Sequence, residues 1–274
     1  MTRIGQRFEQ LRAAGQRGLV AYLTAGDPNL DRTPGLVEAL EQGGADVVEL
    51  GVPFSDPIAD GPVIQRASER ARRAGATLEG VLAAVVRIRR RSQVPLVIFS
   101  YLNPVLRYGL ARFASQAAQA GADGALLTDL SVEEAGPYVT EMRRQGLDTV
   151  FLAAPTSTRR RLELVARYST GFIYLVSRTG VTGERERVSD LVRPLVERAR
   201  AVTSLPLAVG FGLSRPEHLA ELAPLAEAAV VGSAFMSLIE KQAGSAGLEE
   251  KLRECAAGLK AGFREVHGTV GLAR

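Results

Sequence analysis

Eight short apolar segments recur along the chain, and each is followed by a longer stretch with a helical pattern. The segments contain few polar positions, as expected for parallel strands that are covered on both faces. In the stretches between them, apolar residues recur at steps of three and four, and several stretches end in glycine, a common helix stop. The predicted strands are 19–24, 46–51, 95–100, 124–129, 148–153, 172–177, 206–211 and 228–233.

Alternating strand and helix units of this number predict a (β/α)₈ TIM barrel. An open doubly wound sheet is the alternative, but its usual G-x-G-x-x-G turn is replaced after the first strand by TAGDPNLD. Residues 1–15 form an additional amphipathic pattern with Ile4, Phe8 and Leu11 on one face. We expect this helix to close the bottom of the barrel. No linker or shift in composition interrupts the chain, so we expect a single domain over residues 1–274.

A short motif occurs twice in this pattern. Gly44-Ala45-Asp46 and Gly121-Ala122-Asp123 each end a predicted helix and open a predicted strand. The repetition supports the same reading of alternating strand and helix units.

The composition excludes several classes of protein. With 46% hydrophobic and 23% charged residues and a net charge of +4, the chain is typical of a soluble globular protein. The arginine runs 89–91 and 159–161 are short and lack interleaved aromatic residues, so we expect no nucleic-acid partner. The N-terminus lacks the apolar core of a signal peptide, and no stretch reaches membrane-spanning length. We therefore expect a cytoplasmic protein with no membrane association.

Thiolate and histidine chemistry is also disfavoured. The single cysteine, Cys255, excludes an internal disulfide and a metal site built on several thiolates. The two histidines, His218 and His267, lie far in sequence from any other metal-ligand cluster. We expect them at the surface or at helix caps, and we predict no metal site.

The stretch VELGVPFSDPIADGP (48–62) carries the most unusual chemistry. Glu49 interrupts an apolar strand just before it ends, and Asp60 follows in a proline-rich loop. Active sites of such barrels lie at the carboxyl ends of the strands. A carboxyl group among apolar neighbours has a raised pKa and can carry a proton near neutral pH, whereas one on a wetter loop stays ionised. The structural alternatives are a salt bridge for Glu49 and a helix cap for Asp60.

Three loops after the last predicted strands suit a phosphate group. They are RTGVTGERE (178–186), VGFGLS (209–214) and VVGSAF (230–235). Glycines let backbone N–H groups approach an anion, and a helix that begins near Ser233 adds its positive end. Ordinary turns are the alternative, but three such loops at one end of a barrel favour phosphate binding.

The sequence resembles the tryptophan synthase α subunit family over essentially its whole length. The stretch ELGVPFSDPIADGPVIQ is close to a family signature, and LTAGDP, SYLNPV, SRTGVTG and GFGLS follow in the family's order and spacing. The resemblance implies retro-aldol cleavage of indole-3-glycerol phosphate to indole and glyceraldehyde 3-phosphate, with no cofactor in this chain.

The resemblance also assigns roles to residues. Glu49 matches the general acid–base that protonates indole C3, and Asp60 matches the aspartate that interacts with the indole N–H. Tyr174 matches a tyrosine beside the glutamate, and Thr182 matches a threonine on a loop that closes over the site. The phosphate-binding positions match Gly183, Gly212, Gly232 and Ser233, with Phe211 adjacent, and the pocket positions are Tyr22, Phe99, Tyr101 and Leu126.

A partner protein is implied as well. Asp56 and Pro57 match the family's contact segment for the tryptophan synthase β subunit, a pyridoxal-phosphate enzyme that receives the indole in an α₂β₂ complex. Ser131 stands where many members have proline, in a loop linked to communication between the subunits. Tyr22 and Phe99 stand where pocket residues of other sizes often occur.

Three other readings remain open from the sequence. A stand-alone indole-3-glycerol phosphate lyase would keep the same acidic residues and would release free indole. A non-catalytic subunit that only activates a β partner would not need Glu49, Asp60 and the phosphate loops together. A different phosphate-binding barrel is disfavoured by the signature at 48–62.

Overall fold

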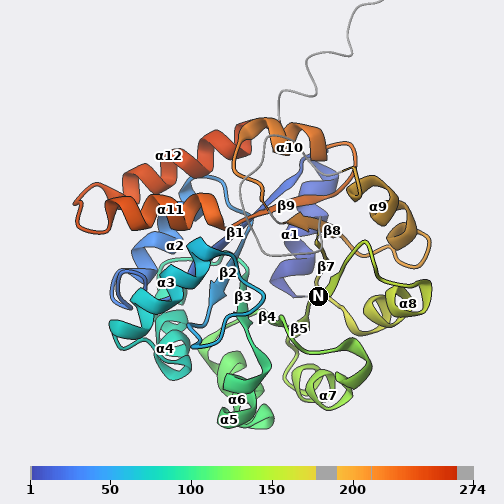
Figure 1. The fold of residues 1–274 in the computed structure, drawn as a ribbon, viewed down its shortest axis with the longest axis horizontal. Coiled ribbons are helices and arrows are strands. Elements are labelled where there is room, and N and C mark those ends of the chain that lie inside the picture. Colours follow the sequence, from blue (N-terminus) through green and yellow to red (C-terminus); the bar gives the residue numbers. More distant parts are fainter. Residues whose placement is uncertain (1, 177–189, 211, 264–274) are drawn as a thin grey trace, which may run out of the picture.

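The computed structural model describes residues 2–176, 190–210 and 212–263, and it confirms the predicted barrel. Parallel strands form a ring that helices surround (Figure 1), and the strand order is β5-β4-β3-β2-β1-β9-β8-β7-β6. Within the described residues the strands are β1 (Gly18–Thr24), β2 (Val47–Gly51), β3 (Leu96–Ser100), β4 (Gly124–Leu127), β5 (Asp148–Thr149), β6 (Phe151–Ala153), β7 (Ile173–Val176), β8 (Leu207–Gly210) and β9 (Ala228–Val231).

The predicted fifth strand, 148–153, is interrupted at Val150 and forms both β5 and β6. Its first half pairs with β4 and its second half pairs with β7, so this one segment joins the two edges of the sheet. Strands of a closed barrel are staggered, and one segment can therefore reach different neighbours along its length. The backbone N–H of Val150 still donates to the carbonyl of Ala125 at 3.1 Å.

Helices fill the connections between the strands, and several connections contain two. The pattern at 132–146 predicts one helix, but the structure has a short 3₁₀ turn followed by α7, because Pro137 fits only in the first turn of a helix. The helices are α1 (Arg3–Ala13), α2 (Thr33–Gln42), α3 (Pro62–Arg73), α4 (Leu78–Arg89), α5 (Leu102–Tyr108), α6 (Leu110–Ala120), η1 (Val132–Glu134), α7 (Gly136–Arg144), α8 (Arg159–Tyr168), α9 (Val192–Arg200), α10 (Pro216–Leu222), α11 (Ser233–Gln242) and α12 (Leu248–Ala261).

The N-terminal helix α1 packs against the inside of the barrel, as the sequence predicts. Ile4, Phe8 and Leu11 are all buried, and they share one apolar cluster with residues from the strands. The rings of Phe8 and Phe172 lie 5.8 Å apart between centroids. Burial of these side chains closes the end of the barrel at which the strands begin.

The repeated motif at 44–46 and 121–123 has a structural role at this same end. Asp46 accepts a hydrogen bond from the first strand's Leu19 N–H at 2.6 Å, and Asp123 accepts one from Leu96 N–H at 2.8 Å. Each carboxylate also binds an arginine of α1, Arg7 and Arg3 respectively. The two acids therefore hold neighbouring strands and α1 in register.

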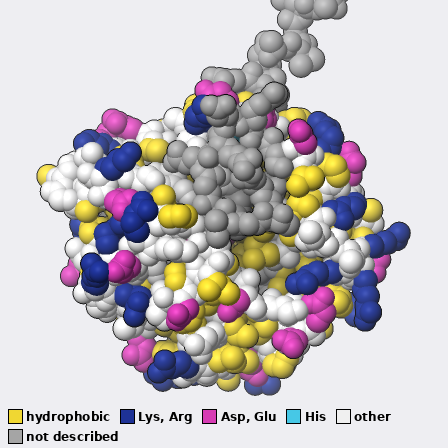
Figure 2. Space-filling view, in the orientation of Figure 1, with side chains coloured by type: hydrophobic (Ala, Val, Ile, Leu, Met, Phe, Trp, Pro, Cys, Tyr) yellow, Lys and Arg dark blue, Asp and Glu magenta, His cyan; other side chains and the backbone are white. Residues whose placement is uncertain are grey.

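Charged and hydrophobic side chains lie on different parts of the surface. Figure 2 shows charged side chains spread around the rim, and hydrophobic side chains gathered where Figure 1 labels α5, α6 and β4. Among the described residues, Ile58 and Leu106 are large hydrophobic side chains that are 77% and 51% exposed. None of the helices in the described part of the chain has the length and apolar character needed to cross a membrane.

Candidate active site

Glu49 is the third residue of β2, and its neighbours in register are Tyr22 on β1 and Val97 on β3. The side chain is fully buried, and neither carboxyl oxygen has a hydrogen-bond partner among the described residues. Burial raises the pKa of Glu49 to about 8. This agrees with the raised pKa expected from the sequence and argues against the salt-bridge alternative. At pH 7 the group therefore carries a proton that it can donate.

Asp60 approaches the same pocket from the loop between β2 and α3. Burial raises its pKa to about 6, and the hydrogen bond from the Tyr101 hydroxyl, at 3.0 Å, opposes this rise. The loop is thus drier than the sequence suggests, yet most of the Asp60 carboxyl is ionised at pH 7. Two carboxyl groups with pKa values on either side of neutral can act as proton donor and as negative charge respectively.

Tyr101 holds Asp60 from outside the pocket. Its hydroxyl donates to the Asp60 carboxylate and accepts a hydrogen bond from the backbone N–H of Ala59 at 3.0 Å. Its ring packs against Phe54, with 5.2 Å between centroids. One phenol therefore contacts the loop at its beginning and at its end, and fixes the carboxylate between them.

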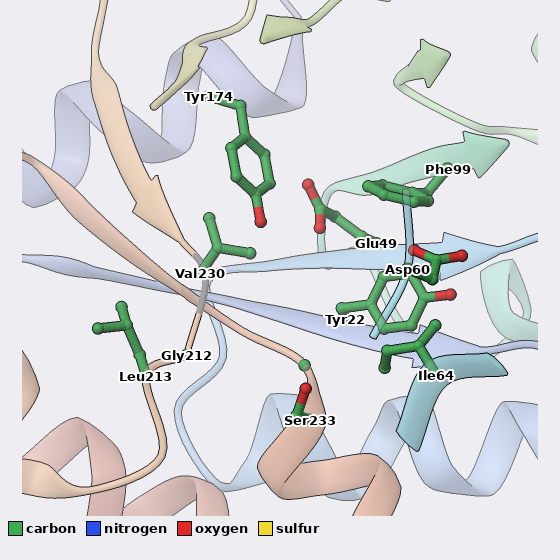
Figure 3. A pocket seen from close by; sticks show the side chains of 11 residues that line it. Tyr22, Glu49, Asp60, Ile64, Phe99, Tyr174, Gly212, Leu213, Val230 and Ser233 are labelled. Carbon is green, nitrogen blue, oxygen red and sulfur yellow. The ribbon is translucent and has the colours of Figure 1, made fainter. Parts of the chain in front are cut away.

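Two buried tyrosines form walls beside Glu49 (Figure 3). The Tyr22 hydroxyl lies so close to Gly51 that a Cβ atom there would meet it at 2.1 Å, and the Tyr174 hydroxyl covers Gly210 in the same way at 2.3 Å. Burial raises the pKa of both hydroxyls, so they stay protonated. The Tyr22 ring meets Phe99 edge-on at 5.0 Å. These contacts leave a mostly apolar space beside the carboxyl groups.

Backbone groups suited to an anion lie at the other end of the pocket. Helix α11 begins at Ser233, as the sequence predicts, with Gly232 as its N-cap. Gly212 has φ +82°, a conformation that favours glycine. A Cβ atom at Gly232 would lie 3.2 Å from the Cβ of Tyr22, so this glycine also lets α11 start close to the pocket wall. The first N–H groups of α11 have no partner within the helix and suit a phosphate oxygen.

These parts enclose one pocket, with a volume of about 470 Å³ including its open mouth. Figure 3 shows carboxyl groups on one side and Ser233 on another. The lining residues are Tyr22, Glu49, Asp60, Ile64, Phe99, Tyr174, Gly212, Leu213, Val230, Gly232 and Ser233.

Three lining residues were not predicted. Val230 lies two positions before Gly232 on β9, and the two-residue period of a strand could have found it. Leu213 follows Gly212 directly, and Ile64 lies one turn into α3 after Asp60. For Ile64 and Leu213 the sequence gives no signal beyond their proximity to predicted residues.

The other predicted residues have different positions. Tyr101 and Leu126 do not line the pocket: Tyr101 lies behind Asp60, and Leu126 packs in the apolar cluster inside the barrel. Gly183, Thr182 and Phe211 lie outside the described residues.

Comparison with known proteins decides the family. The model of the family described as tryptophan synthase alpha chain matches residues 8–264. A tryptophan synthase alpha chain from Solibacter usitatus (strain Ellin6076) is 66% identical over 263 residues, which are 96% of this chain and 98% of the relative. The chain belongs to the tryptophan synthase alpha chain family.

Solved structures agree with this assignment. Tryptophan synthase of Mycobacterium tuberculosis matches with a TM-score of 0.89 and 38% identity, over 96% of this chain and 98% of that one. The tryptophan synthase subunit alpha of Legionella pneumophila matches with a TM-score of 0.88 and 34% identity, over 97% and 99%. As a member of this family, the chain is a lyase that cleaves indole-3-glycerol phosphate.

In this alpha chain, the segment predicted to contact a partner is largely exposed. Asp56 and Ile58 are exposed and Pro57 is partly exposed, while the start of the loop is fixed by Ser68. The Ser68 hydroxyl accepts from the N–H of Phe54 at 2.8 Å and donates to its carbonyl at 3.0 Å. The loop therefore presents an exposed tip between two anchored ends.

Other polar residues near the strand ends have structural roles. Asp129 accepts a hydrogen bond from Leu102 N–H at 2.6 Å and so caps α5. His218 is buried, contrary to a surface position, and its Nδ1 accepts from Ser214 N–H at 3.2 Å at the start of α10. No group of three or more metal-ligating side chains occurs in the part of the chain that the structure describes.

The pKa of Glu49 predicts a cost in stability. Its folded-state pKa of about 8 exceeds the ordinary 4.5, so the unfolded state releases this proton first, and stability falls as pH rises from 4.5 to 8. At about 1.4 kcal/mol for each pH unit, Glu49→Gln should gain on the order of 3 kcal/mol over the wild type between pH 5 and pH 7. Urea unfolding at several pH values measures this difference.

Glu240→Gln is the control for this measurement. Hydrogen bonds from Arg66 are the main reason that the pKa of Glu240 is lowered to about 2, so its effect on stability should not change between pH 5 and pH 8. A Glu49→Gln difference that is equally flat would contradict the raised pKa.

Proposed function

We propose that this chain cleaves indole-3-glycerol phosphate with Glu49 as the proton donor and Asp60 as the charge that stabilises the departing indole. The observation that supports this most strongly is the fully buried carboxyl of Glu49, which has no hydrogen-bond partner among the described residues and shares the pocket with the ionised Asp60. The whole barrel acts as one domain in this proposal.

The reaction follows from proton transfers that the two carboxyl groups can perform. Glu49 gives its proton to C3 of the indole ring, which makes the bond from C3 to the glycerol phosphate chain able to break. The ring nitrogen becomes positive, and Asp60 accepts a hydrogen bond from its N–H. The glycerol hydroxyl next to the breaking bond then loses its proton to Glu49, which restores the carboxyl group and leaves glyceraldehyde 3-phosphate and indole.

The walls of the pocket assist this step by shape and dryness. Tyr22, Phe99 and Tyr174 surround the carboxyl groups with aromatic rings, which suit a flat apolar indole. A pocket that excludes water strengthens the interaction between Asp60 and the developing positive charge. No cofactor takes part in this proposal.

The phosphate is placed at the N-terminal end of α11. Ser233 and Gly232 supply backbone N–H groups there, and Gly212 supplies a close approach from the loop after β8. Gly183 and Phe211, which match further phosphate positions, are part of the same proposal.

Partner binding is the last part of the proposal. The exposed tip formed by Asp56, Pro57 and Ile58 is the docking segment for a tryptophan synthase β subunit, which holds pyridoxal phosphate in an α₂β₂ complex and receives the indole. Ser131 lies beside η1 and hydrogen-bonds Glu133, and it belongs to the same docking region. The cytoplasmic location predicted from the sequence stays a prediction.

The roles of the acids are tested by Glu49→Gln and Asp60→Asn. Each should lower kcat by about 10²–10⁴-fold, because each removes a group that acts on the transition state. Substrate affinity should change little. Steady-state cleavage of indole-3-glycerol phosphate measures both.

Asp129→Asn is the matched control, since Asp129 also follows a strand end but only caps α5. It should leave kcat close to that of the wild type, because Asp129 does not line the pocket. Retention of more than half of the wild-type turnover by Glu49→Gln would contradict the proposed acid.

The phosphate site is tested by Gly212→Ala. Because φ is +82°, a side chain strains the backbone here and pushes the phosphate away. KM should rise more than about tenfold while kcat changes little, the signature of lost ground-state binding. Inorganic phosphate or glyceraldehyde 3-phosphate should also stabilise this variant less than the wild type, as measured by thermal unfolding.

Gly146→Ala is the control, since Gly146 has φ +69° and no atom near its Cβ position. It introduces similar backbone strain away from the pocket, so it should lower stability and leave KM unchanged. Equal effects of the two variants on KM would place the phosphate elsewhere.

The partner is tested by titrating the chain with a tryptophan synthase β subunit while following cleavage. The rate should rise with β subunit, because docking increases the fraction of chains with Asp60 in place. Ile58→Ser should raise the half-saturating concentration of β subunit more than about tenfold, as expected for a central apolar contact. Val86→Ser, which changes an exposed valine on α4, should leave the half-saturating concentration of β subunit unchanged.

Two outcomes would contradict docking at this segment. If the free chain is fully active and forms no complex at micromolar concentrations, the stand-alone lyase reading holds. If the two serine variants weaken binding equally, the partner contacts another surface.

A further inference from the structure

A cluster of charged side chains outside the pocket joins three parts of the barrel. Arg70 on α3 binds both carboxylate oxygens of Asp27, with Nε at 3.0 Å from Oδ1 and Nη2 at 2.7 Å from Oδ2. Its remaining nitrogen, Nη1, donates to Glu240 on α11 at 2.7 Å. Arg66, one turn earlier on α3, binds the same Glu240 through two further hydrogen bonds.

The connection to Asp27 is the buried part of this cluster. Asp27 lies in the loop after β1 and its side chain is 0% exposed, whereas that of Arg70 is 29% exposed. Burial raises the pKa of Asp27, and the hydrogen bonds and charge of Arg70 oppose the rise. A buried carboxylate is stable only with such a partner, so Arg70 cannot move away from Asp27 without a large cost. This fixes α3 against the end of β1.

Helix α3 carries the loop that holds Asp60. The loop ends at Asp60 and Gly61, and Gly61 is the N-cap of α3. The start of the loop is bound to the same helix through Ser68 and Phe54. Any shift of α3 therefore moves both ends of the loop.

Helix α11 carries the other end of the pocket. It begins at Ser233 in the pocket wall, and Glu240 lies seven residues later on the same helix. Helices α3 and α11 pack against each other and both contact β1, and Figure 1 shows them on the same side of the barrel. The bridge from Arg70 to Glu240 thus spans the helix behind Asp60 and the helix behind the phosphate end.

We propose that Arg70 is a positioning residue, which fixes α3 against β1 and α11 and so sets the place of Asp60 relative to the phosphate end of the pocket. The inference rests on the proposed function, because it assigns to Arg70 the placement of an acid whose role is itself proposed. Arg70 touches neither the pocket nor the reacting atoms, and it acts through the helix.

The first test compares arginine variants of α3 in the full chain, with and without β subunit. Arg70→Lys keeps the charge but loses the forked contact, and Arg70→Gln loses both. We expect kcat/KM to fall about tenfold and about a hundredfold respectively, the scale of a catalytic group displaced by about 1 Å. Arg73→Gln is the matched control, because Arg73 pairs only with Glu69 within the same helix in the described structure, and it should change kcat/KM less than about twofold.

The second test separates positioning from a merely structural role. In an Asp60→Asn background the acid is already absent, so Arg70→Gln should cost less than about threefold in kcat/KM. Glu240→Gln keeps the buried Asp27–Arg70 pair and weakens the link to α11 by removing its charge, and it should behave in the same way with a smaller loss. This variant keeps the test valid if Arg70→Gln fails to fold.

The outcomes distinguish the inference from the proposed function. Equal losses in the wild-type and Asp60→Asn backgrounds, or full activity of both Arg70→Gln and Glu240→Gln, would overturn the positioning role. If Asp60→Asn itself retained wild-type turnover, the proposed function would fail instead. A loss that disappears in the Asp60→Asn background supports both.

Discussion

A carboxyl group held inside a protein with no hydrogen-bond partner is unfavourable, and the rest of this structure depends on holding one at Glu49, which has no such partner among the described residues. The group stays neutral because ionisation in that position would cost several kcal/mol. It stays in position because β2 lies between β1 and β3 in a continuous ladder. The apolar contacts of the barrel offset this cost. As a result, the buried carboxyl can donate a proton near neutral pH.

Three other buried acids of the barrel show how different this arrangement is. Asp46, Asp123 and Asp27 are each buried, and each binds an arginine or lysine side chain. They hold strands, helices and loops together. Among the described residues, Glu49 is the carboxylate whose buried oxygens lack any partner. This contrast separates an acid kept for chemistry from acids kept for structure, which the sequence alone does not do.

Much of the fold could be predicted, because the hydrophobic pattern that distinguishes strands from helices can be read from residues close together in the sequence. Continuous apolar strands alternate with amphipathic helices, and the faces of α1 fall where the pattern puts them. The break at Val150 was not visible, since it depends on which strands the two halves of one segment meet across the closed barrel. The positions of Glu49 and Asp60 in the pocket followed from their place at a strand end and in the next loop.

The remainder of the site depends on contacts between distant parts of the chain. Tyr101 was predicted as a pocket residue, but it reaches the back of Asp60, 41 positions earlier. The pairing of Arg70 with Glu240 spans 170 positions. No local pattern distinguishes these residues from other tyrosines, arginines and glutamates, because their partners are set by how the strands and helices pack.

The most direct test of the central claim is to follow the Glu49 carboxyl itself. The full chain labelled with ¹³C at glutamate carboxyl carbons, compared with Glu49→Gln to assign the signal, gives its titration by NMR. The account predicts a midpoint near pH 8 for Glu49. A midpoint near the ordinary 4.5 would show that the carboxyl is ionised at neutral pH and would contradict its role as the proton donor.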